Sequence, residues 1–414
     1  MFRNRTTNRE RRRVTVITAL RTRGGVGNYY DVVLPCLGDE FVACRVGSPI
    51  HGQGAMRRAI PVVLDAVRLA RVLVTTRADT MLVNPSLDAR SLVRDGLSIL
   101  IAKALGRRVV VFFRGWDVAT ELRLRGLRMS MFRGVFFRAD ACIVLFSGYR
   151  ATLRQWGFRR PIHVLSTVAA RGCFDAGAAR ESRLTHSRDG VVRVLFMGWL
   201  ARDKGILEVI EAFALARRRM ETLELVVVGE GPAAEDARLV AAEHGVAEVV
   251  FRGHLSGKAK FVALSEADIF ILPSGHGEGM PNAVLEALAS GLTVIASPVG
   301  GLRDFLFDRR LGMEAADVSP EGLAALLVKA AGNSAGRAEF AVNGRDFAKR
   351  HFTPDTCASA LREVIDLLRD RDGSAESQVE ITWYEVDGEP GAARAPEGPP
   401  HATQSHRGIE VQPP

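Results

Sequence analysis

The sequence lacks the long apolar runs, paired cysteines and leader patterns that mark membrane-embedded or secreted proteins. In 414 residues there is no apolar stretch of 18 or more, so we expect no transmembrane helix. The five cysteines are scattered without a CxxC pair, which fits reduced thiols in a cytoplasm and argues against a zinc site or a disulfide framework. The basic N-terminus leads into a short apolar run with no cleavage pattern, and we interpret it as a first strand rather than a signal peptide.

Several motifs of catalysis and nucleic-acid recognition are missing as well. The chain has no HExxH, no Ser/His/Asp arrangement and no G-x-G-x-x-G fingerprint. Its one DxD, formed by Asp370 and Asp372, lies at the edge of the C-terminal tail and far from any expected strand end, so we expect no metal site there. No helix-turn-helix, RNP-like or zinc-finger pattern supports a non-enzymatic nucleic-acid binder.

Charge is divided unevenly along a chain whose composition, 47% hydrophobic and 25% charged, is that of a soluble globular protein. Residues 1–170 hold 29 Lys and Arg against 11 Asp and Glu, whereas the remainder holds 27 against 36. A basic front half indicates an anionic partner such as lipid headgroups, a phosphorylated substrate or nucleic acid. The alternative is an arginine-rich surface that is merely solvated.

Short apolar strands alternate with amphipathic helices, which predicts a doubly wound α/β architecture with two Rossmann-like domains facing a cleft. Residues 169–190 read as a loop-like connection between the domains. The tail holds six prolines after residue 385 and little apolar periodicity, so it cannot bury enough surface to stay ordered. The expected parts are a first domain at 1–180, a second domain at 190–351, a helix at 352–371 that packs back across the domains, and a disordered tail at 372–414.

Two glycine-rich turns each stand between an expected strand and an expected helix. In "RTRGGVGNYY", Gly25 and Gly27 would let backbone N–H groups approach a phosphate at a helix N-terminus, although a turn without a ligand fits equally well. In "VLFMGWLARDKG", Lys204 stands where a strand end meets a helix start and could reach a diphosphate. The alternative for Lys204 is a solvated loop residue.

The segment "GHGEGMPNAVLEALASG", residues 275–291, carries the strongest signal. Residues 282–290 predict a short helix that is apolar on nearly every side, yet Glu286 lies within it and Glu278 lies in the loop before it. A buried carboxylate needs a partner, and the hydroxyls of a sugar or a ribose would supply one. For either residue alone, a surface position or a favourable helix dipole is the alternative.

This segment resembles the E-x7-E signature of family-four glycosyltransferases, which are retaining enzymes with the two-domain GT-B fold. Further blocks, "GGVGNYY", "FMGWLARDKG" and "VVVGEGP", follow in the family's order, so that the resemblance covers roughly residues 14–370. It implies a nucleotide-sugar donor, a glycan or lipid-linked acceptor, no DxD metal site and no other cofactor. A weaker similarity, in "LVNPSLDARSLVRDG", implies bacterial cell-surface polysaccharide assembly.

The resemblance also implies roles for individual residues. Glu278 would contact the donor sugar and stabilise the transition state, Lys204 would neutralise the departing diphosphate, and Glu286 would hold the ribose. The remaining donor-binding positions are Gly279, Met280, Asn282, Arg202, Gly25 and Gly27. Two departures concern Trp199, where the family often has Arg, and Arg114, where it usually has His. Arg202 would substitute for the first, while Arg114 and Asp117 would serve the acceptor.

Residues 121–140 combine five arginines with Leu, Met and Phe, which is typical of a basic amphipathic helix on an anionic membrane. A packed helix whose arginines cover their own apolar stems is the alternative. We therefore expect a cytoplasmic glycosyltransferase, peripheral to the inner face of the plasma membrane. A GT-B-fold nucleotide-sugar epimerase is the rival enzyme, and it would turn over its donor without an acceptor.

Overall fold

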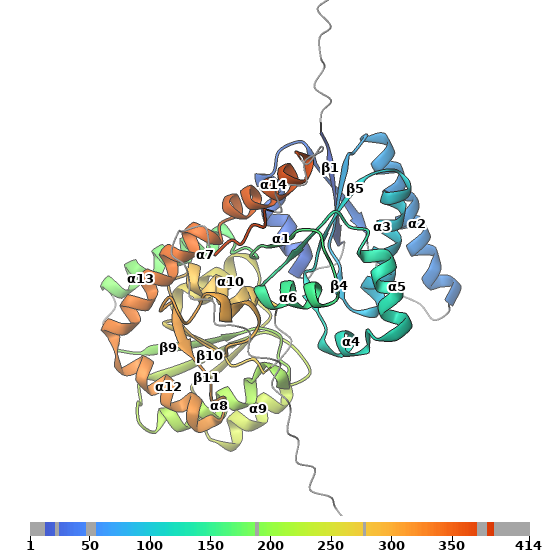
Figure 1. Cartoon of the computed structure of the whole chain (residues 1–414). Helices are drawn as coiled ribbons and strands as arrows, with labels where there is room; N and C mark the ends of the chain where they lie inside the picture. The colour runs from blue at the N-terminus through green and yellow to red at the C-terminus, as the bar shows by residue number, and fades with distance from the viewer. Residues whose placement is uncertain are drawn as a thin grey trace, which may run out of the picture.

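Two α/β domains follow one another along the chain, which confirms the fold class that the alternating pattern predicts (Figure 1). The computed structural model describes residues 13–20, 25–46, 55–186, 190–275, 279–370 and 379–384. Each domain is built on a six-stranded sheet in which all strand pairs are parallel. Because helices cover both faces of such a sheet, its central strands are buried on both sides, and Thr80–Val83 and Ile269–Leu272 are buried at every position.

The first sheet has the order β2-β1-β3-β5-β7-β8, and a short pair, β4 with β6, stands beside it. Its strands are β1 (Thr15–Leu20), β2 (Phe41–Val46), β3 (Thr80–Val83), β4 (Ser86–Leu87), β5 (Arg108–Phe112), β6 (Gly115–Trp116), β7 (Ala141–Val144) and β8 (Ile162–Val164). Its helices are α1 (Gly25–Val33), η1 (Leu34–Cys36), α2 (Ala55–Thr75), α3 (Ala89–Ala104), α4 (Val118–Arg123), α5 (Gly126–Phe136) and α6 (Ser147–Gln155). Figure 1 shows α2, α3 and α5 together on one side of this sheet.

The second sheet has the order β11-β10-β9-β12-β13-β14, so the chain reverses its direction of travel between β9 and β12. Its strands are β9 (Val192–Met197), β10 (Leu223–Val228), β11 (Val249–Gly253), β12 (Ile269–Leu272), β13 (Thr293–Ala296) and β14 (Gly312–Glu314). Its helices are α7 (Arg171–His186), η2 (Arg202–Lys204), α8 (Ile206–Arg217), α9 (Ala234–Glu243), α10 (Gly257–Glu266), α11 (Asn282–Ala289), η3 (Gly300–Asp304), α12 (Pro320–Gly332) and α13 (Ser334–His351). Ligands of doubly wound sheets bind beside such a reversal, at the carboxyl ends of the strands.

The interpretation of residues 169–190 as a loop is wrong, because most of them form α7. This helix packs on α10 of the second domain, where a side chain at Gly172 would collide with Phe261. A Cβ at Gly177 would lie 3.0 Å from the carbonyl oxygen of Ala289. The glycines that suggested a loop are thus the positions at which the helix approaches its neighbours closely. Since α7 belongs to the second domain, the first domain ends before residue 171 rather than at 180.

The last helix, α14 (Pro354–Arg369), leaves the second domain and packs on α1 and η1 of the first. Thr353 caps its N-terminus, and Pro354 occupies the first turn, where proline is tolerated. At its other end, Arg369 is buried and donates to the hydroxyl of Thr15 at 3.0 Å and to Asp79 at 3.1 Å. Up to residue 370, the described part of the chain therefore passes from the first domain to the second before α7 and returns to the first in α14.

The predicted disorder from residue 372 onward is wrong for residues 379–384, which we call the C-terminal strap. Thr382 forms a parallel bridge with Val164 at the end of β8, and Arg150 donates to the Thr382 hydroxyl at 2.9 Å. Trp383 is buried in an aromatic cluster of the second domain, with its ring 5.1 Å from that of Phe352. The strap is ordered because it pairs with the free edge of β8 and packs into this aromatic cluster. Neither contact can be predicted from the composition of the tail.

Candidate functional site

A cavity of about 410 Å³ is lined by residues of both domains. Its lining residues are Ser86, Leu87, Asp88, Trp116, Asp117, Val118 and Asp203. They follow the carboxyl ends of β3, β5 and β9, which are the ends at which parallel sheets bind ligands. Of these residues Asp203 comes from the second domain and the others from the first, so the cavity lies between the two domains. The cleft that the sequence predicts is therefore present.

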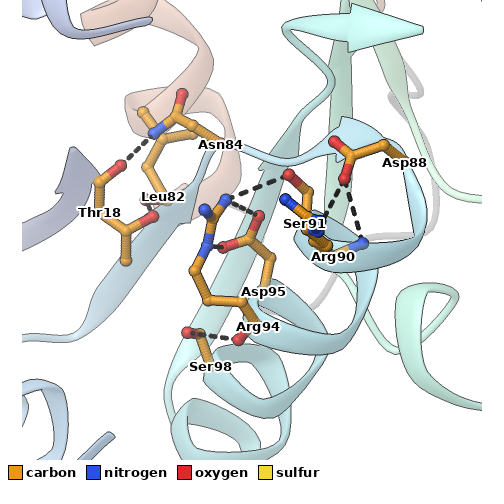
Figure 2. Close-up of polar contacts among 9 residues, drawn as sticks. All are labelled: Thr18, Leu82, Asn84, Asp88, Arg90, Ser91, Arg94, Asp95 and Ser98. Carbon is orange, nitrogen blue, oxygen red and sulfur yellow. Dashed lines mark hydrogen bonds and ion pairs between the residues drawn. The ribbon is translucent and has the colours of Figure 1, made fainter. Parts of the chain in front are cut away.

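Two carboxylates on the first-domain wall of the cavity are held in place by helix caps. Asp88 accepts from the backbone N–H groups of Arg90 and Ser91 at 3.1 and 3.0 Å, and so begins α3 (Figure 2). Asp117 begins α4 and accepts from the hydroxyl and the backbone N–H of Thr120 at 2.6 and 2.9 Å. The Thr120 hydroxyl, with the backbone N–H groups, holds the pKa of Asp117 below its ordinary value. The cavity edge thus carries fixed negative charge.

A buried hydrogen-bond chain joins α1 to the ends of β1 and β3. The amide of Asn84 donates to the carbonyl of Thr18 at 2.7 Å (Figure 2) and accepts from the hydroxyl of Tyr30 at 2.7 Å. Tyr30 lies in the second half of α1, so this helix is tied to the segment that follows β3. Gly25 and Gly27 are the first and third residues of α1, whereas the rest of their glycine-rich turn lies outside the described residues.

On the second-domain side, Lys204 ends the short helix η2 and precedes Gly205. Gly205 has a φ of +73°, and a Cβ there would lie 2.7 Å from Pro273, so only glycine fits. The carbonyl of Asp203 accepts from the N–H of Gly275 at 2.8 Å. These contacts hold Lys204 beside the residues that follow β12. The strands β9 and β12, which precede these two segments, are the neighbours between which the order of the sheet reverses.

Glu278 lies outside the described residues, but the residues that follow it are described and lie close to the first domain. The carbonyl of Gly279 accepts from the N–H of Gly301 at 2.7 Å, and its Cα faces Leu145 and Tyr149 of the first domain. Met280 is buried. Asn282 is the first residue of α11, and this helix end has no side-chain cap. The start of α11, where the Val284 N–H donates to the carbonyl of Pro281 and no side chain caps the helix, therefore lies close to the other domain.

Glu286 has a partner that the sequence pattern does not reveal. Its Oε1 lies 2.6 Å from the ammonium of Lys260 on α10, and both side chains are largely buried. Glu286 thus points neither into bulk water nor into an apolar core without a counter-charge. The two residues are 26 positions apart, on helices that flank β12, and no local signal predicts the pair. Lys260 is a site residue that sequence reasoning missed.

Asp88 and Asp203 were also missed, but the first had a readable signal. Asp88 stands directly before a helix-forming run, which is the position of a capping residue. Arg202 is brought to Asp236 of α9 at 2.6 Å and is not among the cavity lining. Trp199 is 61% exposed on the segment between β9 and η2. Within the described ranges no group of three His, Cys, Asp or Glu side chains could hold a metal ion.

Comparison with known proteins supports a family relationship for the second domain. Residues 191–333 match the family model described as "Glycosyl transferases group 1". An uncharacterized glycosyltransferase of Methanocaldococcus jannaschii is 25% identical over 178 residues, which are 43% of this chain and 45% of that protein. The GDP-mannose-dependent alpha-mannosyltransferase of Mycolicibacterium smegmatis is 36% identical over 138 residues, 33% and 34% of the two chains. The matched region thus spans less than half of either relative.

The fold match extends further than the sequence match. The crystal structure of Anabaena HepE in complex with UDP and glucose aligns with a TM-score of 0.66 over 85% of this chain and 99% of that chain, at 15% identity. At this identity the likeness establishes architecture alone. The chain has the GT-B fold, and its second domain carries the sequence pattern of group 1 glycosyl transferases.

Proposed function

We propose that this protein is a retaining, metal-independent glycosyltransferase that moves a sugar from a nucleotide-sugar donor to a glycan or lipid-linked acceptor in surface polysaccharide biosynthesis. The observation that carries the proposal is the cavity that both domains build at the carboxyl ends of their sheets. A bimolecular transfer needs two substrates held face to face, and a cleft between two domains provides this arrangement. The UDP and glucose in the HepE complex support a nucleotide-sugar donor.

The donor would lie against the second domain. Its diphosphate would meet the ammonium of Lys204 and the uncapped N-terminus of α11, where the helix dipole favours an anion. Lys260 pairs with Oε1 of Glu286. The ribose hydroxyls of the donor would donate to the second oxygen of this carboxylate. Glu278 would contact the donor sugar, as the resemblance of this segment to the E-x7-E signature implies. Catalysis would rest on positioning and on stabilising the charge of the departing diphosphate.

The acceptor would lie against the first domain. Asp88 and Asp117 are oriented by their helix caps, and Asp203 faces them from the second domain. Ionised carboxylates accept hydrogen bonds from hydroxyl groups, which a glycan offers in number. Asp117 would thus bind acceptor hydroxyls next to the donor sugar.

The test begins with thermal-shift screening of the full chain against UDP-, GDP- and ADP-sugars, followed by transfer assays with the donor that binds. We expect Glu278→Gln to abolish transfer while donor binding is kept. Glu266→Gln, which changes an exposed acid on α10, is the matched control and should behave as wild type. Full activity of Glu278→Gln would refute its role. Turnover of the donor without any acceptor would favour the epimerase instead.

We further propose that the first domain rests on an anionic membrane through the outer faces of α2, α3 and α5, which we call the three-helix face. Neighbouring helices contact one another here, α2 with α3 and α3 with α5 (Figure 1). Large apolar side chains are exposed at helical spacing on each of them: Val63, Leu64 and Val67 on α2, Val93, Leu97 and Leu100 on α3, and Leu127 and Met131 on α5. None of the described helices is long and apolar enough to cross a membrane.

The charge of the three-helix face favours anionic lipid over a protein of mixed charge. The only acids within α2 and α3 are Asp65 and Asp95, and both are buried. Asp95 pairs with Arg94 at 2.6 Å (Figure 2), and Asp65 with Arg68 at 3.6 Å. Helix α5 contains no acid, and its arginines at 128 and 133 are exposed. Apolar side chains among exposed arginines are the composition of surfaces that bind anionic bilayers.

Vesicle flotation tests this part of the proposal. Wild-type protein should float with phosphatidylglycerol vesicles and stay unbound with phosphatidylcholine, and added salt should weaken the binding. Leu127→Glu with Met131→Glu should abolish flotation. Leu239→Glu, which changes an exposed leucine on α9 of the second domain, is the control and should leave flotation intact. Flotation that survives the α5 double change would contradict the assignment of this face.

A further inference from the structure

Arg114 is a largely buried cation that has no acidic partner among the described residues. Its guanidinium lies 3.9 Å from the ring centre of Tyr29 and 4.6 Å from that of Phe112. Nη2 donates to the hydroxyl of Thr167 at 3.1 Å, whereas Nη1 is buried and donates to nothing. No carboxylate of the described residues forms an ion pair with it. Burial lowers the pKa of Arg114 from its ordinary value, and nearby Tyr29, Tyr30 and Cys357 offset part of this effect.

This arrangement costs free energy in the unliganded protein. A buried charge is normally paired, because removing an ion from water is repaid only by an opposite charge and by hydrogen bonds. Stacking on Tyr29 and one bond to a hydroxyl compensate in part. The planar guanidinium still presents unused N–H groups in the fork geometry that matches a carboxylate or a phosphate.

Arg114 lies between β5 and β6, at the edge of the first sheet that carries the cavity. It follows the carboxyl end of β5 and precedes β6, whose Trp116 lines the cavity. Its backbone N–H donates to the carbonyl of Pro85 at 2.9 Å, which holds it against the chain leaving β3. Thr167, its side-chain partner, follows the end of β8. The cation therefore stands at the ligand-binding edge of the first sheet.

We propose that Arg114 binds an anionic group, a carboxylate or a phosphate, of a substrate held in the cleft. This inference rests on the proposed function and makes it narrower: one of the two substrates is acidic at the end that lies against the first domain. The group belongs to the donor as a sugar carboxylate or its diphosphate, or to the acceptor as a carboxylate or a phosphate. The same chemistry serves all of these sources, and the experiment separates them.

A matched control comes from the other end of the same strand. Arg107 directly precedes β5 and also has a buried N–H group, Nε, with no partner. It stands at the amino edge of the sheet, where doubly wound domains do not bind their ligands. Arg114→Gln and Arg107→Gln therefore make the same chemical change at opposite ends of β5.

Calorimetric titration of the full chain uses ligand pairs that differ by one anionic group. UDP-glucuronic acid against UDP-glucose tests the donor sugar, and UDP against uridine tests the diphosphate. Glucose 6-phosphate and methyl glucuronide against methyl glucoside, all in the presence of UDP, test the acceptor. We expect Arg114→Gln to weaken the anionic member of one pair tenfold or more and to leave its neutral member unchanged. Arg107→Gln should change neither.

Thermal melting of the unliganded variants separates binding from packing. If Arg114 serves a ligand, Arg114→Gln removes an uncompensated charge and should leave the melting temperature unchanged or raise it. A lowered melting temperature with equal losses for both members of every pair would overturn the proposal, as would unchanged affinity throughout. If wild-type protein binds no nucleotide sugar at all, the proposed function fails. Titration with inorganic pyrophosphate and with glucuronate then still tests Arg114.

Discussion

Asp304 of the second domain caps a helix of the first domain through Ser147. Its carboxylate accepts from the backbone N–H of Ser147 at 2.8 Å and from the hydroxyl at 2.7 Å. No side chain of the first domain itself caps this end of α6. Tyr149, two residues further along α6, lies against Gly279 in the loop before α11. The cap therefore couples the position of the first domain to the segment proposed to hold the donor.

We expect Asp304→Ala to lower the free energy of unfolding by about 1–2 kcal/mol, the usual effect of losing an N-cap side chain. Asp304→Asn keeps an oxygen that accepts from the backbone of Ser147 and should lose less. Urea denaturation of the two variants measures the difference. Equal losses would show that the charge of Asp304, rather than its cap geometry, stabilises the interface.

The same residue predicts a pH dependence. Burial raises the pKa of Asp304 above its ordinary value of 3.8, and hydrogen bonds from Ser147 offset only part of this effect. The folded protein then keeps a proton that the unfolded chain has already lost, so the stability from this group falls as pH rises from about 4 through the folded pKa. Asp304→Asn cannot titrate and should gain stability relative to wild type over this range. A constant difference between about pH 4 and about pH 7 would contradict the raised pKa.

The pair of Lys260 and Glu286 predicts non-additive stability. Lys260→Met leaves a largely buried carboxylate without its counter-ion and should cost on the order of 3 kcal/mol. Glu286→Met leaves the ammonium unpaired and should cost a similar amount. The double variant removes both charges and should lose clearly less than the two single losses combined. Equilibrium unfolding of all four proteins completes this cycle, and additive losses would show that the two groups act independently.

The proposed ribose contact of Glu286 predicts a specific loss of nucleotide discrimination. Wild-type protein should bind UDP, or whichever nucleotide screening identifies, more tightly than its 2′-deoxy counterpart. Glu286→Gln should reduce this preference by about tenfold, because the charged acceptor is lost. Titration calorimetry with both nucleotides gives the ratio. An unchanged ratio would assign Glu286 to structure alone.

The C-terminal strap predicts that a part of the apparent tail stabilises the fold. Trp383→Ala empties a site against Phe305 and Phe352 and should lower the free energy of unfolding by about 3 kcal/mol. Truncation after residue 371 should lower it at least as much, whereas truncation after residue 384 should have little effect. Chemical denaturation of the three proteins provides the comparison. An unchanged midpoint for the shorter truncation product would place the strap outside the stable core.

The alternation of apolar strands and amphipathic helices was enough to predict two Rossmann-like domains, because burial on both faces of a parallel sheet leaves a pattern along each strand. The helix Pro354–Arg369 lies within residues 352–371, where this pattern predicts a helix. The pattern failed where burial depends on distant partners. Residues 171–186 have the composition of a loop, and they form a helix whose glycines pack closely against α10 and α11. The strand β2 was not predicted, because half of its side chains are exposed or partly exposed.

The candidate site was likewise predicted in part from local sequence patterns and decided in part by tertiary contacts. The sequence alone singled out Lys204, Glu286 and the loop around Gly279, since a charge in an apolar run and glycines after a strand are local signals. Only the tertiary structure supplied Lys260 as the partner of Glu286, brought Asp203 and Asp88 to one cavity, and left Arg114 without an acidic partner among the described residues. Charge pairing acts through space, over a few ångströms, between residues that the chain separates by tens of positions. It is therefore decided by packing, after the local pattern has already chosen the helices and strands.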